Sequence, residues 1–222
     1  MNGLVRVIVT AGGLLVAAPA LGQGWPLAGG VNLGTTGLGA ELQAQVAPSW
    51  VLRGDADWLG FSRDETYSNV PYRGRARSAT AGAFVDWHPA QGPFVIALGG
   101  YFGDRKLRLS AAPSGNVVIG GRNFTPDQVG RLDGEVKLSA AQPFAGVGFD
   151  NTFTHTSGWG VRGMAGVAFS DAPKVSLRAT GGAFAGTPAL QAALQEEEAS
   201  IRRDTRRYRY YPILQLGVTR RF

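Results

Sequence analysis

Apolar and polar side chains alternate along several segments of this chain, each about ten residues long. In WVLRGDADWLGF (50–61), Trp50 and Trp58 share one parity, and the charged residues Arg53, Asp55 and Asp57 share the other. Successive side chains of a β-strand point to opposite faces. In a soluble sandwich the apolar face packs in the core. Two tryptophans on one face and three charges on the other fit that arrangement poorly. The pattern therefore favours a wall with lipid outside and water or ion pairs inside.

Six further segments repeat the alternation: 37–46, 79–87, 94–102, 141–149, 159–169 and 210–222. Bacterial single-chain barrels have an even number of strands, so the seven segments require one more. The Gly-rich stretch 25–36 is predicted provisionally as the first strand; the alternative is that part of a long connection crosses the membrane. The predicted fold is all-β, a transmembrane antiparallel up-and-down barrel of eight strands.

The connections alternate in length. Those at 47–49, 88–93 and 150–158 are short, and those at 62–74, 103–138 and 170–209 are long. Outer-membrane barrels have short periplasmic turns, long extracellular loops and aromatic girdles at both interfaces. The alternation of short and long connections therefore predicts the orientation of the barrel, with the short connections in the periplasm and the long ones outside the cell. The predicted girdle comprises Trp50, Trp58, Trp87, Phe94, Trp159 and Phe222.

The last long connection contains a helix signal, TPALQAALQEEEASIRRDTRRY (187–208). Pro188 suits the first helical position, and Glu198 can pair with Arg202 one turn later. We predict an extracellular-loop helix above the last strand. Its basic cluster predicts binding to lipid A phosphates; a solvated face neutralised by nearby glutamates is the alternative. The cluster is Arg202, Arg203, Arg206, Arg207 and Arg209.

The first residues of the chain indicate how it reaches the membrane. Residues 1–22 are typical of a secretory signal peptide, with Arg6 ahead of an apolar core and small residues after it. The predicted domains are a signal peptide at 1–22 and an outer-membrane barrel at 23–222. The chain has no cysteine, which excludes disulfides and thiolate metal sites.

An eight-stranded barrel is just wide enough for its own side chains to fill. The inward charges are predicted to pair and close the lumen, because buried charges need partners; a charged ion path is the alternative. A porin of 16–18 strands is excluded by the chain length. The predicted lumen network is Glu41, Arg53, Asp55, Asp57, Asp86 and Arg162.

His155 and Ser157 have the spacing used by the outer-membrane lipid A deacylases, which the chain resembles in size. A serine hydrolase needs a base oriented by a third group, and no acidic residue is evidently placed to orient His155. The pair also falls in a turn expected to be periplasmic. We therefore predict no catalytic residue, no enzymatic activity, no cofactor and no metal site.

The segment YYPILQLGVTRRF (210–222) resembles the C-terminal signature of Gram-negative outer-membrane barrel proteins, with Arg220 as a departure. In that family the final aromatic residue is read by the barrel-assembly machinery. The resemblance implies that Phe222 is an assembly signal and that this machinery is a partner.

The whole pattern resembles the small OmpW and OmpA-transmembrane barrels. This resemblance implies the outer membrane of a Gram-negative bacterium, lipopolysaccharide and other outer-membrane lipids as partners, and a monomer that binds no nucleic acid. For function we expect a non-enzymatic structural barrel or a narrow conduit for small apolar molecules. The alternatives are a surface adhesin, or a ligand- or lipopolysaccharide-binding barrel, and less readily a lipid A-modifying hydrolase.

Overall fold

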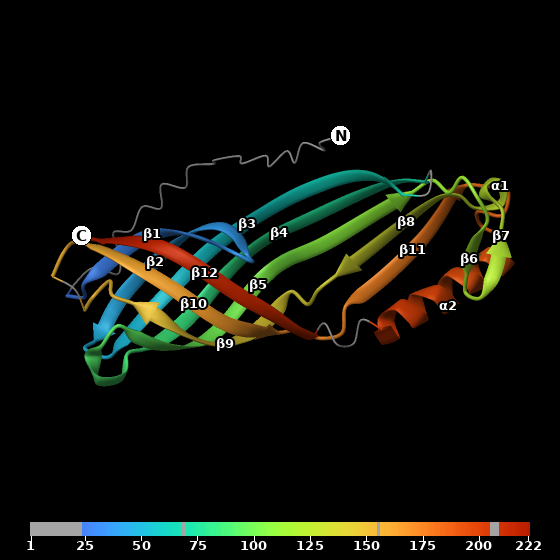
Figure 1. Ribbon diagram of the computed structural model, residues 1–222. Helices are drawn as coiled ribbons and strands as arrows, with labels where there is room; N and C mark the ends of the chain where they lie inside the picture. Colours follow the sequence, from blue (N-terminus) through green and yellow to red (C-terminus); the bar gives the residue numbers. More distant parts are fainter. Residues whose placement is uncertain (1–23, 68–69, 155, 205–208) are drawn as a thin grey trace.

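The computed structural model describes residues 24–67, 70–154, 156–204 and 209–222. Eight antiparallel strands close into a barrel (Figure 1), with β1 paired to β12 and β5 paired to β9. The predicted barrel of eight strands is confirmed, and the provisional first strand is present as β1. The ring contains β1 (Leu27–Gly34), β2 (Gly37–Ala47), β3 (Trp50–Tyr67), β4 (Val70–Trp87), β5 (Phe94–Ala111), β9 (Ala141–Asp150), β10 (Trp159–Phe169) and β12 (Tyr210–Arg221).

The barrel wall has its apolar side chains outside. On β12 the outward Leu216 is 73% exposed, whereas the neighbouring Gln215 is 2% exposed. On β3 the outward Trp58 is 47% exposed and the inward Asp57 is fully buried. A water-soluble barrel would show the opposite distribution, because apolar surface is stabilised by removal from water.

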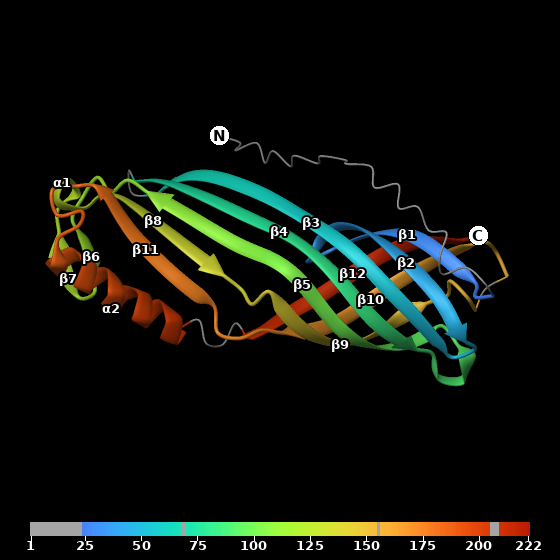
Figure 2. The same ribbon diagram turned by 180° about the vertical axis from the view of Figure 1, so that it is seen from behind.

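The short connections gather at one end of the molecule, together with the C-terminus (Figure 2). One of them contains the single-turn helix η1 (Pro89–Gln91). The predicted signal peptide at 1–22 lies outside the described residues.

At the opposite end the sheet continues far beyond the closed ring. β3 and β4 remain paired out to Tyr67 and Val70, and β5 runs on to Ala111. The prediction of a long loop at 62–74 is therefore wrong. The sequence of this part of β3, SRDETY (62–67), lacks the apolar–polar alternation that marks a lipid-facing strand, although the backbone pairing continues.

Two more strands widen this extension, β8 (Gly130–Lys137) beside β5 and β11 (Lys174–Gly181) beside β8. Between β5 and β8 the chain forms the hairpin of β6 (Val117–Ile119) and β7 (Arg122–Phe124) and the short helix α1 (Pro126–Val129). The long connections are thus largely ordered secondary structure, and β3, β4, β5, β8 and β11 form an open sheet beyond the ring. We call it the extracellular sheet, because the predicted orientation places this end outside the cell.

The predicted helix is confirmed as α2 (Pro188–Asp204). It lies beside β11 and beyond the start of β12 at Tyr210 (Figure 1). Leu190, Ala193 and Leu194 of α2 join Phe124 and Val129 in a second apolar core outside the barrel. The Glu198 carboxylate accepts a hydrogen bond from the Leu177 amide of the edge strand β11 at 2.7 Å. No helix in the described part of the chain is long and apolar enough to span a membrane.

Candidate functional site in the barrel lumen

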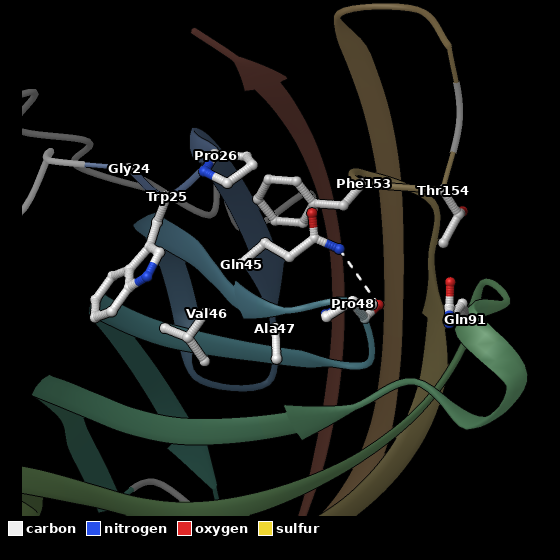
Figure 3. A pocket seen from close by; sticks show the side chains of 10 residues that line it. All are labelled: Gly24, Trp25, Pro26, Gln45, Val46, Ala47, Pro48, Gln91, Phe153 and Thr154. Atoms are coloured by element: carbon white, nitrogen blue, oxygen red, sulfur yellow. Dashed lines mark hydrogen bonds between the residues drawn. The ribbon is translucent and has the colours of Figure 1, made fainter.

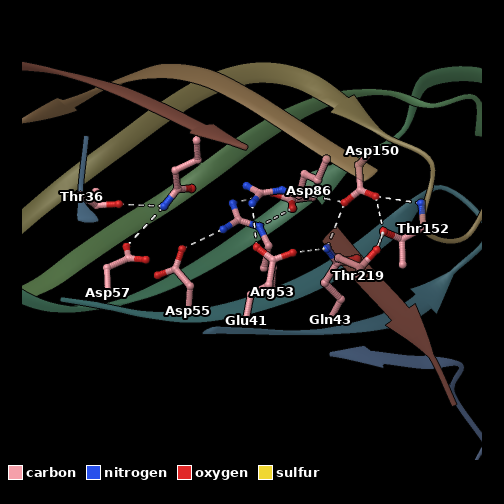
Figure 4. A network of polar contacts seen from close by, with 12 residues as sticks. Thr36, Glu41, Gln43, Arg53, Asp55, Asp57, Asp86, Asp150, Thr152 and Thr219 are labelled. Carbon is pink, nitrogen blue, oxygen red and sulfur yellow. Dashed lines mark hydrogen bonds and ion pairs between the residues drawn. The ribbon is translucent and has the colours of Figure 1, made fainter. Parts of the chain in front are cut away.

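The six residues predicted for the lumen project inward because each lies on the parity opposite to the exposed apolar residues of its strand. Glu41 comes from β2, Asp86 from β4 and Arg162 from β10. The others, Arg53, Asp55 and Asp57, come from β3, and all six are at most 6% exposed. Figure 4 shows Glu41, Arg53, Asp55, Asp57 and Asp86 close together within the ring.

Arg53 holds two carboxylates. Its Nε donates to Asp86 Oδ2 at 2.7 Å, and its Nη1 donates to Asp55 Oδ2 at 3.0 Å. The same guanidinium lies over the ring of Phe84, 3.9 Å from the ring centroid. A charge-assisted pair of this kind in a water-poor site is much stronger than a surface pair. Arg53 therefore fixes β3 to β4 from the inside.

Arg162 organises a second group. Its Nη1 donates to Glu41 Oε2 at 2.8 Å, and its Nε lies 3.8 Å from Asp150 Oδ2. Gln43 Nε2 donates to both Glu41 and Asp150 at 3.0 Å. Thr152 donates its backbone amide to Asp150 at 2.9 Å. These contacts join β2, β9 and β10 across the lumen.

Asp57 belongs to a third group, nearer the end of the barrel with the long connections. Gln215 Nε2 donates to Asp57 Oδ2 at 3.3 Å and to Thr36 Oγ1 at 3.0 Å. This group joins β12 to β3 and to the β1–β2 turn. Unlike the other two groups, it contains no guanidinium.

Sequence reasoning missed several members of this network. It ended a strand at Phe149 and so placed Asp150 in a turn, and it did not include Gln43 or Gln215 in the network. Arg105 was also missed because 103–138 was predicted as a loop; it is 6% exposed and donates to Gln142. The signal for Arg105 was its shared parity with the inward Tyr101.

Aromatic side chains lie beside the charges in the lumen. Phe84, Tyr101 and Phe144 meet edge to face, with ring centroids 5.0–5.6 Å apart. Met164 and Ile213 pack in the same cluster. We call these five residues the aromatic plug. Arg105 lies over Tyr101 and Tyr211, 5.2 and 4.8 Å from the ring centroids.

Inward glycines make room for the plug. A Cβ at Gly146 or at Gly166 would lie 2.6 Å from the Phe144 ring, and one at Gly99 would lie 2.6 Å from Phe84. Real Cβ atoms do not approach so closely. The glycines therefore let two large rings lie flat against the barrel wall.

The outer wall carries the predicted girdle residues. All six are exposed, from Trp87 at 41% to Phe222 at 75%. Trp50 and Trp87 are cross-strand partners and their rings stack at 6.2 Å. Phe222 follows β12, and its amide donates to Leu27 O at 3.1 Å.

The basic cluster near α2 is only partly described. Arg202 pairs with Glu198 at 3.1 Å, as predicted for neighbours one helical turn apart. Arg203 and Arg209 are exposed, and Arg206 and Arg207 lie outside the described residues.

The hydrolase alternative has little structural support. His155 lies outside the described residues. The Ser157 hydroxyl donates to Trp159 O at 2.7 Å and accepts from the Trp159 amide at 3.2 Å, so it closes the turn before β10. Among the described residues, no group of three or more His, Cys, Asp and Glu side chains is placed to hold a metal ion.

A cavity of about 550 Å³ opens at the short-turn end of the barrel (Figure 3). Trp25, Gln45 and Phe153 line it, and Gln45 Nε2 donates to Pro48 O at 3.4 Å. None of the lumen charges described above borders this cavity.

The comparisons with known proteins bear on the fold. The chain is similar to the crystal structure of Acinetobacter baumannii CarO2, with a TM-score of 0.59, 23% identity, and coverage of 89% of this chain and 98% of that chain. Acinetobacter baumannii CarO gives the same TM-score and coverage at 21% identity. The fold is that of small outer-membrane β-barrels. No family model matches the chain, and no curated protein matches it significantly. A shared fold does not assign a function.

Proposed function

We propose that this protein is a non-enzymatic outer-membrane barrel, closed to ions, that anchors an ordered extracellular sheet and helix at the cell surface. The observation that carries the proposal is the filled lumen, in which the aromatic plug and the groups around Arg53 and Arg162 cross the ring. Side chains that fill an eight-stranded barrel leave a core rather than a pore.

The closed lumen predicts that purified protein inserted into planar bilayers gives no resolvable single-channel current. The described network holds five carboxylates, Glu41, Asp55, Asp57, Asp86 and Asp150, and three guanidinium groups, Arg53, Arg105 and Arg162. An open ion path through it would therefore be cation-selective. A reproducible, cation-selective current would contradict the proposal.

The membrane location predicts that a charge on the outer wall is costly. Leu216 lies midway along β12, at the level of the bilayer centre. Leu216→Arg should therefore destabilise the barrel by about 2–4 kcal/mol, the usual cost of a lysine or arginine that faces lipid at that depth. Val118→Arg is the control, since Val118 is 65% exposed in the extracellular hairpin. Urea unfolding in lipid vesicles measures both. Equal, small effects of the two substitutions would indicate that water, not lipid, surrounds the barrel.

A second candidate function is ligand binding at the cell surface. The extracellular sheet and α2 share an apolar core of their own, formed by residues such as Ile119, Leu190 and Leu194. An extracellular sheet and helix that are ordered before binding suit a binding surface, because a rigid surface loses less conformational entropy on association. Transport of small apolar molecules has less support, since the plug occupies the path through the ring.

A further inference from the structure

The outward face of the extracellular sheet is strongly basic. Basic side chains outnumber acidic ones at the described outward positions of β4, β5, β8 and β11, where the acidic residues are Asp104, Asp133 and Glu135. We call the basic residues the cationic face: Arg73, Arg75, Arg77, Lys106, Arg108, Arg131, Lys137, Lys174 and Arg178. The opposite face of β8 and β11 is apolar and packs toward α2.

Four of these cations form a row across the sheet. Arg77 is the cross-strand partner of Lys106, Lys106 is the partner of Lys137, and Lys137 is the partner of Lys174. In the next row Arg75 is the partner of Arg108. Like charges directly opposite one another destabilise a sheet. Their arrangement is therefore best accounted for by anions bound on this face.

The carboxylates of the sheet offset only part of this charge. Asp104 pairs with Lys106 at 2.9 Å, and Glu135 pairs with Arg108 at 2.6 Å and with Lys137 at 2.9 Å. Hydrogen bonds from Lys137 and Arg108 lower the pKa of Glu135 to about 2, so this carboxylate stays ionised. Within the described part of the chain, Arg75, Arg77 and Lys174 form no ion pair.

The cationic face begins directly above the apolar wall. Trp58 is level with Ala79, and Arg77 and Arg75 lie two and four residues further toward the extracellular end of β4. At about 3.3 Å per residue and about 40° of tilt, they stand roughly 5 and 10 Å above Trp58. That height is where the headgroups of the outer leaflet lie. Arginine suits phosphate there because its guanidinium donates two parallel hydrogen bonds.

We propose that the cationic face binds the phosphates of a phosphorylated glycolipid in the surrounding outer leaflet. This inference rests on the proposed membrane location. It moves the predicted lipid-binding site from the helix cluster to the sheet, since Arg202 is already paired with Glu198 and α2 packs on the other face. The glycolipid would neutralise the Arg77 row and hold the sheet close to the membrane surface.

The test uses the processed full-length protein, folded in neutral detergent and titrated with bisphosphorylated lipid A. The variant Arg75→Gln/Arg77→Gln should bind about 30-fold more weakly, because each basic residue at a membrane surface contributes a factor of about five in affinity. The control Arg122→Gln/Arg203→Gln removes two exposed arginines elsewhere and should bind as the unmodified protein does. Added salt should weaken binding to the unmodified protein.

Dephosphorylated lipid A and inorganic phosphate are the matched ligands, and both should bind far more weakly. Equal binding by the Arg75/Arg77 variant, an equal loss in the Arg122/Arg203 control, or tight binding of either matched ligand would overturn the proposal. The Leu216→Arg and Val118→Arg pair reports on the membrane location separately. A failed titration with the expected Leu216 effect would therefore reject the glycolipid site and leave the proposed function standing.

Discussion

Arg53→Met is expected to destabilise the barrel by about 3–5 kcal/mol. The substitution leaves Asp55 and Asp86 buried without their guanidinium, and an unpaired buried charge costs far more than the pair itself contributes. It also removes the cation that lies over Phe84. Urea unfolding of the detergent- or vesicle-bound protein, followed by tryptophan fluorescence, measures the change in unfolding free energy.

Two further variants separate the lost partner from the lost volume. Arg53→Met/Asp55→Leu/Asp86→Leu removes the whole charged group and should recover most of the stability, because a well-packed apolar substitute is often neutral. Arg131→Met removes an exposed arginine, 4.0 Å from Asp133, and should cost less than about 1 kcal/mol. If Arg53→Met were as mild as Arg131→Met, the lumen carboxylates would have to be well solvated and the closed-lumen proposal would fail.

The strands of the ring were predictable because lipid and lumen impose opposite demands on the two faces. That contrast marks Trp50 to Trp58 on β3 and Leu214 to Val218 on β12. The sequence 62–67, SRDETY, carries no such contrast. Backbone pairing there depends on the partner strand rather than on a polarity pattern, so the extracellular sheet could not be read from local sequence.

The inward direction of the lumen charges was predictable, but their partners were not. Arg162 and Glu41 are 121 residues apart and meet only because β12 pairs with both β1 and β10. Parity states which face a side chain occupies and says nothing about register around a closed ring. The same limit applied to the row of basic residues on the cationic face, which is formed only by the registers of β4, β5, β8 and β11. That row is Arg77, Lys106, Lys137 and Lys174.

The role of the inward glycines was also hidden. Gly146 and Gly166 share the inward parity of their strands and, without a side chain, suggest loose packing. In the structure they lie against the Phe144 ring, which is 3% exposed. The sequence shows the small residue and the large one separately, and only the closed ring brings them into contact.

Phe144→Ala is expected to cost about 3–5 kcal/mol, because it removes the ring that contacts both Phe84 and Tyr101 and leaves a cavity in the plug. Gly146→Ala should also destabilise the barrel, since its Cβ would lie 2.6 Å from the Phe144 ring.

If the glycine exists to accommodate the ring, the two effects are not additive. In the Phe144→Ala background, Gly146→Ala should cost less by about 0.5–3 kcal/mol, the usual coupling between residues in contact. Gly54→Ala is the control, because the nearest atom to a Cβ there is 3.8 Å away and Phe144 is not among its neighbours. Unfolding free energies of the single and double variants, measured in the same vesicles, give the coupling directly. Additive costs for Phe144 and Gly146 would mean that the plug does not pack against the wall, and the lumen would then be open to water at this level.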